Sequence, residues 1–212
     1  MNLRLGIIAT LIATVALAGC GSSSNTRSPA APSGSPPSGG SSGGSSGGSG
    51  ALSPDATSAA TGDIPDTQNF LTHRDAAHHF SMLYPEGWTV QRQASGSVFR
   101  DKNNLVRVTV APGGAPTTTS MAAELSKLQA SVPTLKLNGA PQTVTLKAGP
   151  AVKATYSTQS APNPVTGKRV TLTVDRYELG HGGQRATLEL GTPTGVDNID
   201  AYKRMANSFT WR

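Results

Sequence analysis

A long run of glycine, serine and proline limits how much of this 212-residue chain can fold. The segment Gly21–Thr61 is mostly Gly, Ser, Pro, Ala and Thr, and its Gly-Ser repeats end at Gly50. Such a segment buries too little apolar surface to offset the entropy that it would lose on ordering. We therefore predict a disordered, flexible stalk over residues 20–63 and one globular domain over residues 64–212.

The first 19 residues have the pattern of a cleaved export signal. Arg4 supplies a positive charge, and the apolar stretch Leu5–Ala18 would span roughly 21 Å as a helix, too short for a ~30 Å hydrocarbon layer. The tetrapeptide Leu17-Ala18-Gly19-Cys20 resembles the bacterial lipobox, whose cysteine becomes the lipid-modified first residue of the mature protein. The resemblance implies a signal peptide over residues 1–19 and palmitate on Cys20. The alternative is an ordinary secretory signal with an incidental cysteine.

A lipid on Cys20 would hold the domain at the outer face of the bacterial cell membrane. Cys20 is the only cysteine, so the folded domain has no disulfide, no thiol nucleophile and no cysteine metal ligand. The net charge of +6 lies in the folded part, where 16 basic residues face 10 acidic ones from Ile64 onward. Basic proteins often bind nucleic acid, but the export signal argues against that partner.

The basic residues are scattered in small groups. Arg100, Lys102 and Arg107 form one group, and Lys168 and Arg169 form another. We interpret them as parts of an ordinary solvated surface, and as a possible attraction to anionic lipid or cell-wall polymers.

From Phe80 onward, short segments rich in β-branched and aromatic residues alternate with turns, which predicts an antiparallel sheet. In Leu105–Ala111 three valines alternate with other residues, so one strand face is expected to be buried and the other largely wet. The predicted strands are Phe80–Tyr84, Trp88–Arg92, Ser97–Arg100, Leu105–Ala111, Thr143–Lys147, Ala151–Thr158, Arg169–Leu179, Gln184–Leu190 and an edge strand over Ser208–Trp211.

Two helices interrupt the strands. The first is predicted to be capped within Thr117–Ser120 and to end at Pro133, and the second covers about Asp197–Ala206. Their apolar stripes are Met121, Leu125 and Leu128 in the first helix, and Ile199, Tyr202 and Met205 in the second. The predicted fold class is α+β, an antiparallel sheet flanked by helices.

The order of these elements, with the turn Tyr84-Pro85-Glu86-Gly87-Trp88 and the terminal Ser208-Phe209, resembles the PsbP-like superfamily and its LpqN-type actinobacterial lipoproteins. The resemblance covers Phe80–Arg212. It implies an α/β/α sandwich and a non-enzymatic role in docking onto other proteins, and it supplies no catalytic residue. Trp88 and Phe209 are expected to be buried anchors of the core.

Metal binding is the first chemistry to weigh, because His73, His78 and His79 lie close together in the sequence. Asp75 is the only carboxylate among them, and the spacing matches no HExxH motif. We interpret this stretch as a polar segment before the first strand, and we predict no metal and no cofactor.

Catalytic patterns are equally weak. The folded part has no Gly-x-Ser-x-Gly motif, and Gly180–Gly183 around His181 is expected to be a hairpin turn rather than a phosphate loop. Asp175 and Glu178 lie three positions apart on one strand, so they should point to opposite faces. We predict no catalytic residue.

The leading functional hypothesis is a lipid-anchored binding or accessory module that docks onto an envelope protein or cell-wall component. The second is a carrier of a small apolar or lipidic ligand held between sheet and helix, which a cavity of several hundred Å³ lined by apolar side chains would favour. An envelope hydrolase is a third, and it would require polar groups that converge in one cleft. A purely structural surface protein remains a further alternative.

Overall fold

The computed structural model describes residues 62–163 and 167–212. The chain divides into two units, Met1–Gly47 and Gly48–Arg212, and every described helix and strand belongs to the second. The predicted signal peptide, Cys20 and nearly all of the predicted stalk lie outside the described residues. No helix of the described part is long and apolar enough to span a membrane.

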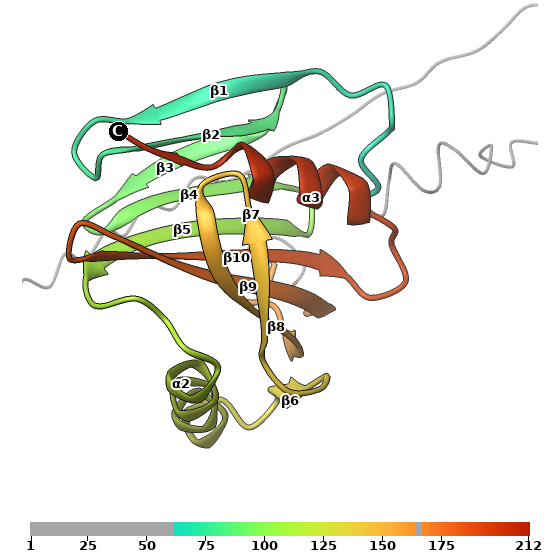
Figure 1. Cartoon of the computed structure of the whole chain (residues 1–212). Coiled ribbons are helices and arrows are strands. Elements are labelled where there is room, and N and C mark those ends of the chain that lie inside the picture. Colours follow the sequence, from blue (N-terminus) through green and yellow to red (C-terminus); the bar gives the residue numbers. More distant parts are fainter. Residues whose placement is uncertain (1–61, 164–166) are drawn as a thin grey trace, which may run out of the picture. The chain divides into compact units, whose positions relative to one another are not determined.

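Strands dominate the described part of the chain (Figure 1). The strands are β1 (Phe70–Asp75), β2 (Phe80–Pro85), β3 (Thr89–Gln93), β4 (Gly96–Asp101), β5 (Asn104–Pro112), β6 (Lys136–Leu137), β7 (Gln142–Leu146), β8 (Gly149–Gln159), β9 (Thr171–His181), β10 (Gln184–Pro193) and β11 (Thr210–Trp211). The helices are α2 (Thr118–Ser131) and α3 (Ile199–Ser208).

The larger sheet has eight antiparallel strands in the order β3-β4-β5-β10-β9-β8-β6, and β7 also pairs with β8. Its two faces follow from alternation along each strand. In β5, Val106 and Val108 are buried on one face, and Arg107 is exposed on the other, as the sequence predicted. We call these the α3 face and the α2 face, after the helix that packs on each.

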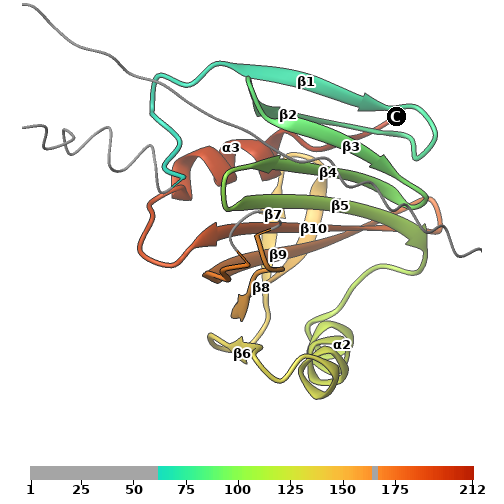
Figure 2. The same cartoon turned by 180° about the vertical axis from the view of Figure 1, so that it is seen from behind.

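The α3 face carries the main core. A smaller sheet, β1-β2-β11, and α3 cover it (Figures 1 and 2). Phe80 and Phe209 stack with ring centroids 5.6 Å apart, and both are fully buried. Trp88 is 9% exposed, so the prediction that Trp88 and Phe209 anchor the core is confirmed.

Helix α2 packs alone on the opposite face, and Figure 2 shows it on the far side of the sheet from α3. Thr117 caps the helix: its hydroxyl accepts from the Ser120 amide, and the Ser120 hydroxyl accepts from the Thr117 amide. Met121 and Leu125 are fully buried against Val152 and Val174 of the sheet. The predicted cap and stripe are therefore confirmed.

Three sequence-based expectations need correction. The segment before Phe80 is not merely a polar lead-in, because it forms β1, whose inward residues His73 and Asp75 are held by side-chain hydrogen bonds. The sheet is split in two, since β1, β2 and β11 pair only with one another. Ile199 is 60% exposed, because the first turn of α3 extends past the core.

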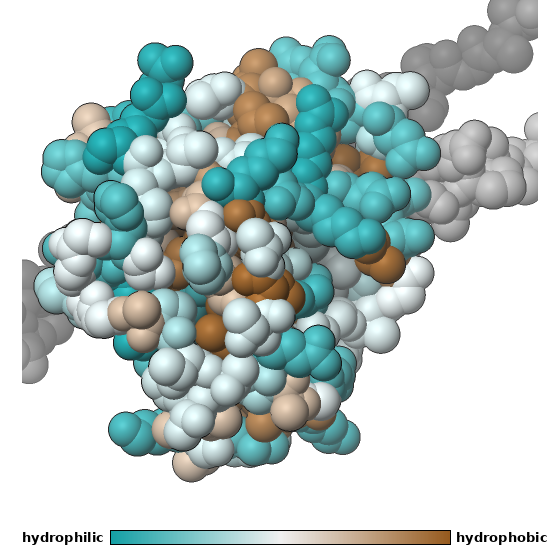
Figure 3. Space-filling view, viewed as in Figure 1, coloured by the Kyte–Doolittle hydropathy of each residue, from teal (hydrophilic) through white to brown (hydrophobic). Residues whose placement is uncertain are grey.

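The fold is thus sheet-rich, with antiparallel sheets and two helices, and the predicted α+β class is confirmed at that level. The helix-flanked sandwich is confirmed only in part, because a second sheet shares the α3 face with its helix. Hydrophilic residues cover the outer side of α3, and apolar residues show only as small areas between them (Figure 3).

Candidate functional site

A groove of about 410 Å³ lies on the α2 face, between the C-terminal half of α2 and the β4–β5 turn. Its floor crosses β5, β10, β9 and β8, which are neighbours in the sheet. The volume falls in the range of small-molecule sites. The groove exists because α2 covers only the β8–β9 side of this face.

One side of the groove is apolar. Leu128 and Val132 project from the end of α2, and Leu135 follows in the next turn. Leu172 and Val174 of β9 continue this wall into the floor, where they are 4% and 5% exposed. An apolar group placed here would contact side chains already packed in the second core cluster.

Gly191 forms the floor of the groove in β10. A Cβ atom at this position would lie 3.4 Å from the Leu105 carbonyl oxygen, 3.4 Å from a Val174 methyl and 3.5 Å from a Leu172 methyl, which are ordinary contacts. The glycine therefore keeps space open that a larger side chain would occupy without straining the backbone.

The opposite side of the groove is basic, because Arg100, Lys102 and Arg107 line it. In the register of β4 and β5, Arg100 lies opposite Leu105 and Arg107 lies opposite Val98. The two arginines thus occupy diagonal positions on the same face, within reach of long side chains. The structure places this predicted group of basic residues at one end of a groove.

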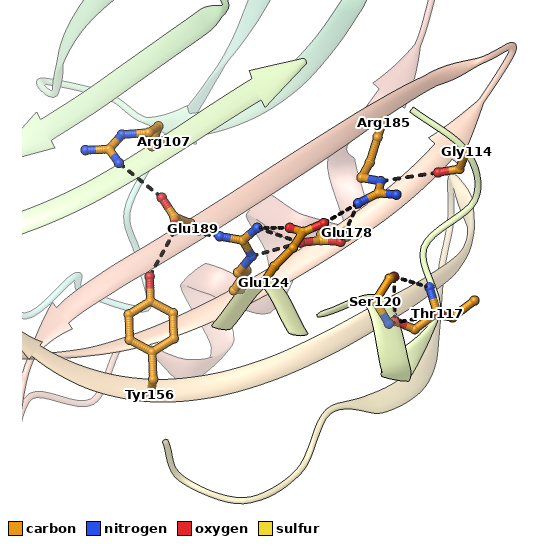
Figure 4. A network of polar contacts seen from close by, with 10 residues as sticks. Arg107, Gly114, Thr117, Ser120, Glu124, Tyr156, Glu178, Arg185 and Glu189 are labelled. Atoms are coloured by element: carbon orange, nitrogen blue, oxygen red, sulfur yellow. Dashed lines mark hydrogen bonds and ion pairs between the residues drawn. The ribbon is translucent and has the colours of Figure 1, made fainter. Parts of the chain in front are cut away.

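Among the described residues that line the groove, Glu189 is the one carboxylate, and it is already engaged (Figure 4). The Tyr156 hydroxyl donates to Glu189 Oε1 at 2.9 Å, and Arg107 donates to Oε2 at 3.2 Å. Burial, and then the Glu189 carboxylate, raise the pKa of Tyr156, so the phenol stays protonated and acts as a donor.

Beneath the first half of α2, a network of charges joins the helix to the sheet (Figure 4). Arg176 donates to Glu178 at 2.6 and 2.9 Å and to Glu124 of α2 at 2.9 Å. Arg185 donates to the other oxygen of Glu124 at 2.6 Å. Glu124 therefore bridges two arginines, which fixes α2 over the sheet.

Glu178 is fully buried, and its Oε2 accepts no hydrogen bond from the described residues. An Arg185 nitrogen lies 3.6 Å from this oxygen. Burial raises the pKa of Glu178 more than its hydrogen bonds from Arg176 lower it. Asp175 lies on the α3 face with Lys153, so the prediction that Asp175 and Glu178 point to opposite faces is confirmed.

The predicted histidine segment forms a polar cluster between the two sheets. Ser97 donates to Asp75 at 2.9 Å, so His73 Nε2 must donate its own proton to Ser97, also at 2.9 Å. In a catalytic triad the histidine lies between the serine and the carboxylate, whereas here Ser97 lies between His73 and Asp75. Ser97 is 0% exposed, so this hydroxyl serves as a structural link.

Titration in this cluster follows from burial and its partners. Burial lowers the pKa of His73, which favours the neutral ring. For Asp75, burial acts to raise the pKa, but hydrogen bonds from Ser97 and His78 outweigh it and the pKa is lowered. For His78, burial acts to lower the pKa, but hydrogen bonds to the Ala94 carbonyl and to Asp75 outweigh it and the pKa is raised.

The other two histidines lie apart from this cluster. His79 occupies the β1–β2 turn with φ 54°, and His181 stacks on Trp211 with centroids 5.8 Å apart. Across residues 62–163 and 167–212, no three His, Asp or Glu side chains gather as a metal site would require. Cys20, the predicted lipidation site, lies outside this part of the chain.

Sequence reasoning did not find Gly191, Tyr156 or Glu189, which line the groove. The local sequence predicts only that each of them is a strand residue, because it does not show which strand will lie beside it. The one available signal was Arg107, a charge in a strand whose valines alternate with it.

No family model matches the sequence, and no curated protein matches it. Among solved structures, the chain is similar to the cyanobacterial PsbP protein (CyanoP) of Synechocystis sp. PCC 6803, with TM-score 0.51, 15% identity, and coverage of 71% of this chain and 98% of that one. The fold is PsbP-like. The expected resemblance is thus confirmed as a fold. The edge strand predicted over Ser208–Trp211 is shorter than expected, because Ser208 ends α3 and the strand covers only Thr210–Trp211.

Two other likenesses are weaker. A Bacteroides thetaiotaomicron protein aligns with TM-score 0.45 and 16% identity over 66% of this chain, and the alignment spans 48% of its own length. The Saccharomyces cerevisiae Ran-binding protein Mog1p aligns with TM-score 0.44 and 10% identity over 68% of this chain and 95% of its own.

Proposed function

We propose that this chain is a lipid-anchored extracytoplasmic binding module, not an enzyme, and that the groove on the α2 face takes a ligand with an extended apolar part. The observation that carries the proposal is the groove itself: about 410 Å³, with Leu128, Val132, Leu172 and Val174 along one wall. Its volume and its apolar wall support the carrier hypothesis, although the opposite wall is polar.

The polar groups of the described residues support a binding role over a catalytic one. Ser97 is buried and donates to Asp75, so its hydroxyl is not available to attack a substrate. In the groove, the Glu189 carboxylate accepts from Tyr156, Arg107 and Arg176. Docking of the module onto an envelope protein remains a prediction from the sequence and the tether.

Binding of decyl-chain ligands to the mature chain, made with Cys20→Ser so that it carries no lipid, tests the proposal. We expect decyl phosphate or decanol to shift the backbone amides of the groove residues in NMR spectra. Gly191→Val places two methyl groups on the floor of the groove. These methyls should displace about two CH₂ groups of the ligand, and losing the burial of those groups should weaken binding about tenfold or more.

Gly114→Val is the matched control, because a Cβ at Gly114 meets nothing within 4 Å and the residue does not line the groove. This variant should bind as the unsubstituted chain does, and both variants should keep their thermal midpoints. If no decyl-chain ligand perturbs the groove amides, or if Gly191→Val binds unchanged, the proposal is wrong.

A further inference from the structure

The groove has a polarity that an apolar ligand alone does not explain. Arg107 on β5 and Tyr156 on β8 are separated by three strand spacings, about 14 Å at ~4.8 Å each. The basic residues line the β4–β5 end, and the apolar residues of α2 and β9 line the other. A ligand that fills the groove would therefore meet cations at one end. At the other end it would meet the apolar side chains of α2 and β9 beside Thr158 and residues 159–163, several of which are polar.

The charges at the basic end are not balanced within the groove. Arg100 and Arg107 line this end beside one carboxylate of the described lining, Glu189. Glu189 also accepts from Arg176, so its charge is shared between two guanidinium groups. The two arginines thus keep an excess of between about one and two positive charges, which suits a phosphate monoester, at about −1.5 to −2 near neutral pH.

Arg100 is the most available of these cations. Its side chain is exposed, and it forms no ion pair within residues 62–163 and 167–212. Only Nη1 of Arg107 donates to Glu189, so the other guanidinium nitrogens can donate to a ligand. Two guanidinium groups at diagonal positions repel each other, and an oxyanion between them would turn that repulsion into charge-assisted hydrogen bonds.

We infer that the groove binds an anionic amphiphile, a phosphate monoester joined to an extended apolar chain, with the phosphate between Arg100 and Arg107 and the chain against Leu128, Val132 and Val174. The inference rests on the proposed function and adds the chemical class of the ligand.

Three probes separate the parts of the inference: decyl phosphate, decanol and inorganic phosphate, each titrated below its aggregation limit into the mature Cys20→Ser chain. Decyl phosphate should bind about tenfold or more tighter than decanol, because hydrogen bonds to a charged group contribute about 1.5–3 kcal/mol and tenfold is ~1.4 kcal/mol. Inorganic phosphate should bind far more weakly than either, since it lacks the chain.

Arg100→Gln should reduce the preference for decyl phosphate over decanol, and Arg100→Gln with Arg107→Gln should abolish it while decanol binding stays unchanged. Arg92→Gln is the matched control: it removes the same charge from an exposed strand residue that does not line the groove. It should keep the full preference. Raising the salt concentration should weaken decyl phosphate more than decanol.

Each other outcome has a definite meaning. Equal affinity for decyl phosphate and decanol overturns the anionic head while leaving the groove's function intact. Inorganic phosphate that binds as tightly as decyl phosphate overturns the amphiphile, because the chain then contributes nothing. Binding of none of the three overturns this inference and the proposed function together.

Discussion

Replacing Arg176 with methionine would remove the hydrogen bonds, 2.6 and 2.9 Å long, that the guanidinium donates to one oxygen of Glu178. The carboxylate is 0% exposed and would keep only Arg185, 3.6 Å from its other oxygen. Methionine fills a similar space, so the main change is a buried charge left without its closest partner. We expect this substitution to destabilise the fold strongly.

The magnitude follows from the burial of the pair. Removing one partner of a buried ion pair costs about 3–5 kcal/mol. Arg185 still offsets part of the Glu178 charge, so the free energy of unfolding should fall by about 3 kcal/mol, at the lower end of that range. For a domain of ~150 residues this corresponds to a drop in thermal midpoint of roughly 6–12 °C.

Urea unfolding followed by tryptophan fluorescence measures this loss, since Trp88 is buried in the core and becomes exposed on unfolding. Arg107→Met is the matched control: Arg107 carries the same charge on the same sheet face, but its side chain is 47% exposed. That variant should lose less than about 1 kcal/mol, as is usual for exposed ion pairs.

The double variant Arg176→Met with Glu178→Leu tests the cause. Replacing both charges by apolar groups should return the stability to within about 1 kcal/mol of the unsubstituted chain, because no buried charge is left unpaired. If Arg176→Met costs less than about 1 kcal/mol, or if the double variant is less stable than the single one, the reasoning about the buried charge is wrong.

The pH dependence gives an independent check. The folded pKa of Glu178 is raised above its ordinary 4.5, so the folded state binds more protons than the unfolded state just above that pH. Burial of the ionised Glu178 carboxylate therefore does not destabilise the fold below pH 4.5. Its destabilising effect grows as the pH rises through the folded pKa. Removing Arg176 raises that pKa further, so the loss in Arg176→Met should be smaller at acid pH than at neutral pH.

Three further predictions concern other parts of the chain. Asp75 has a lowered pKa in the folded state, so its stabilising effect is complete above its ordinary pKa of 3.8 and is lost as the pH falls through the folded pKa. In acid titrations monitored by circular dichroism, Asp75→Asn should not show this loss of stability. Leu125→Ala, at a fully buried position of α2, should lower the free energy of unfolding by about 2–5 kcal/mol in urea titrations, and an effect below 1 kcal/mol would mean that α2 is loosely packed. Palmitate labelling in cells should vanish in Cys20→Ala, and unchanged labelling would disprove the lipid anchor.

Much of the fold was predictable because its signals are local. The alternation in β5, the Thr117 cap and the stripe of Met121 and Leu125 each depend on residues within one turn or one strand. These patterns predicted the element order. They missed β1, because its inward residues are His73 and Asp75, and a buried polar residue looks exposed in sequence until its partner, here Ser97, is known.

The candidate site was not predictable, because it is assembled from segments far apart in the chain. Arg107 and Glu189 are 82 residues apart, and Glu124 and Arg176 are 52 apart, yet each pair is joined by a side-chain contact. Strand pairing sets these neighbours, and the pairing of β5 with β10 is fixed by the global arrangement of the sheet. The group of basic residues was visible in the sequence, but its position at one end of a groove was not.

The groove exists because one helix is too narrow to cover a whole face of the larger sheet. The path from β3 to β6 has six strand spacings, about 29 Å, while a helix with its side chains is only about 10–12 Å wide. The smaller sheet lies beside α3 on the other face, whereas on the α2 face the helix packs over β8 and β9, and residues 159–163 line the groove beside it. A second helix over β4 and β5 would bury Arg100 without a partner, at high cost. The exposed arginines thus keep the β4–β5 part of this face polar and open. The groove lies where the part of the face that α2 covers meets this open part.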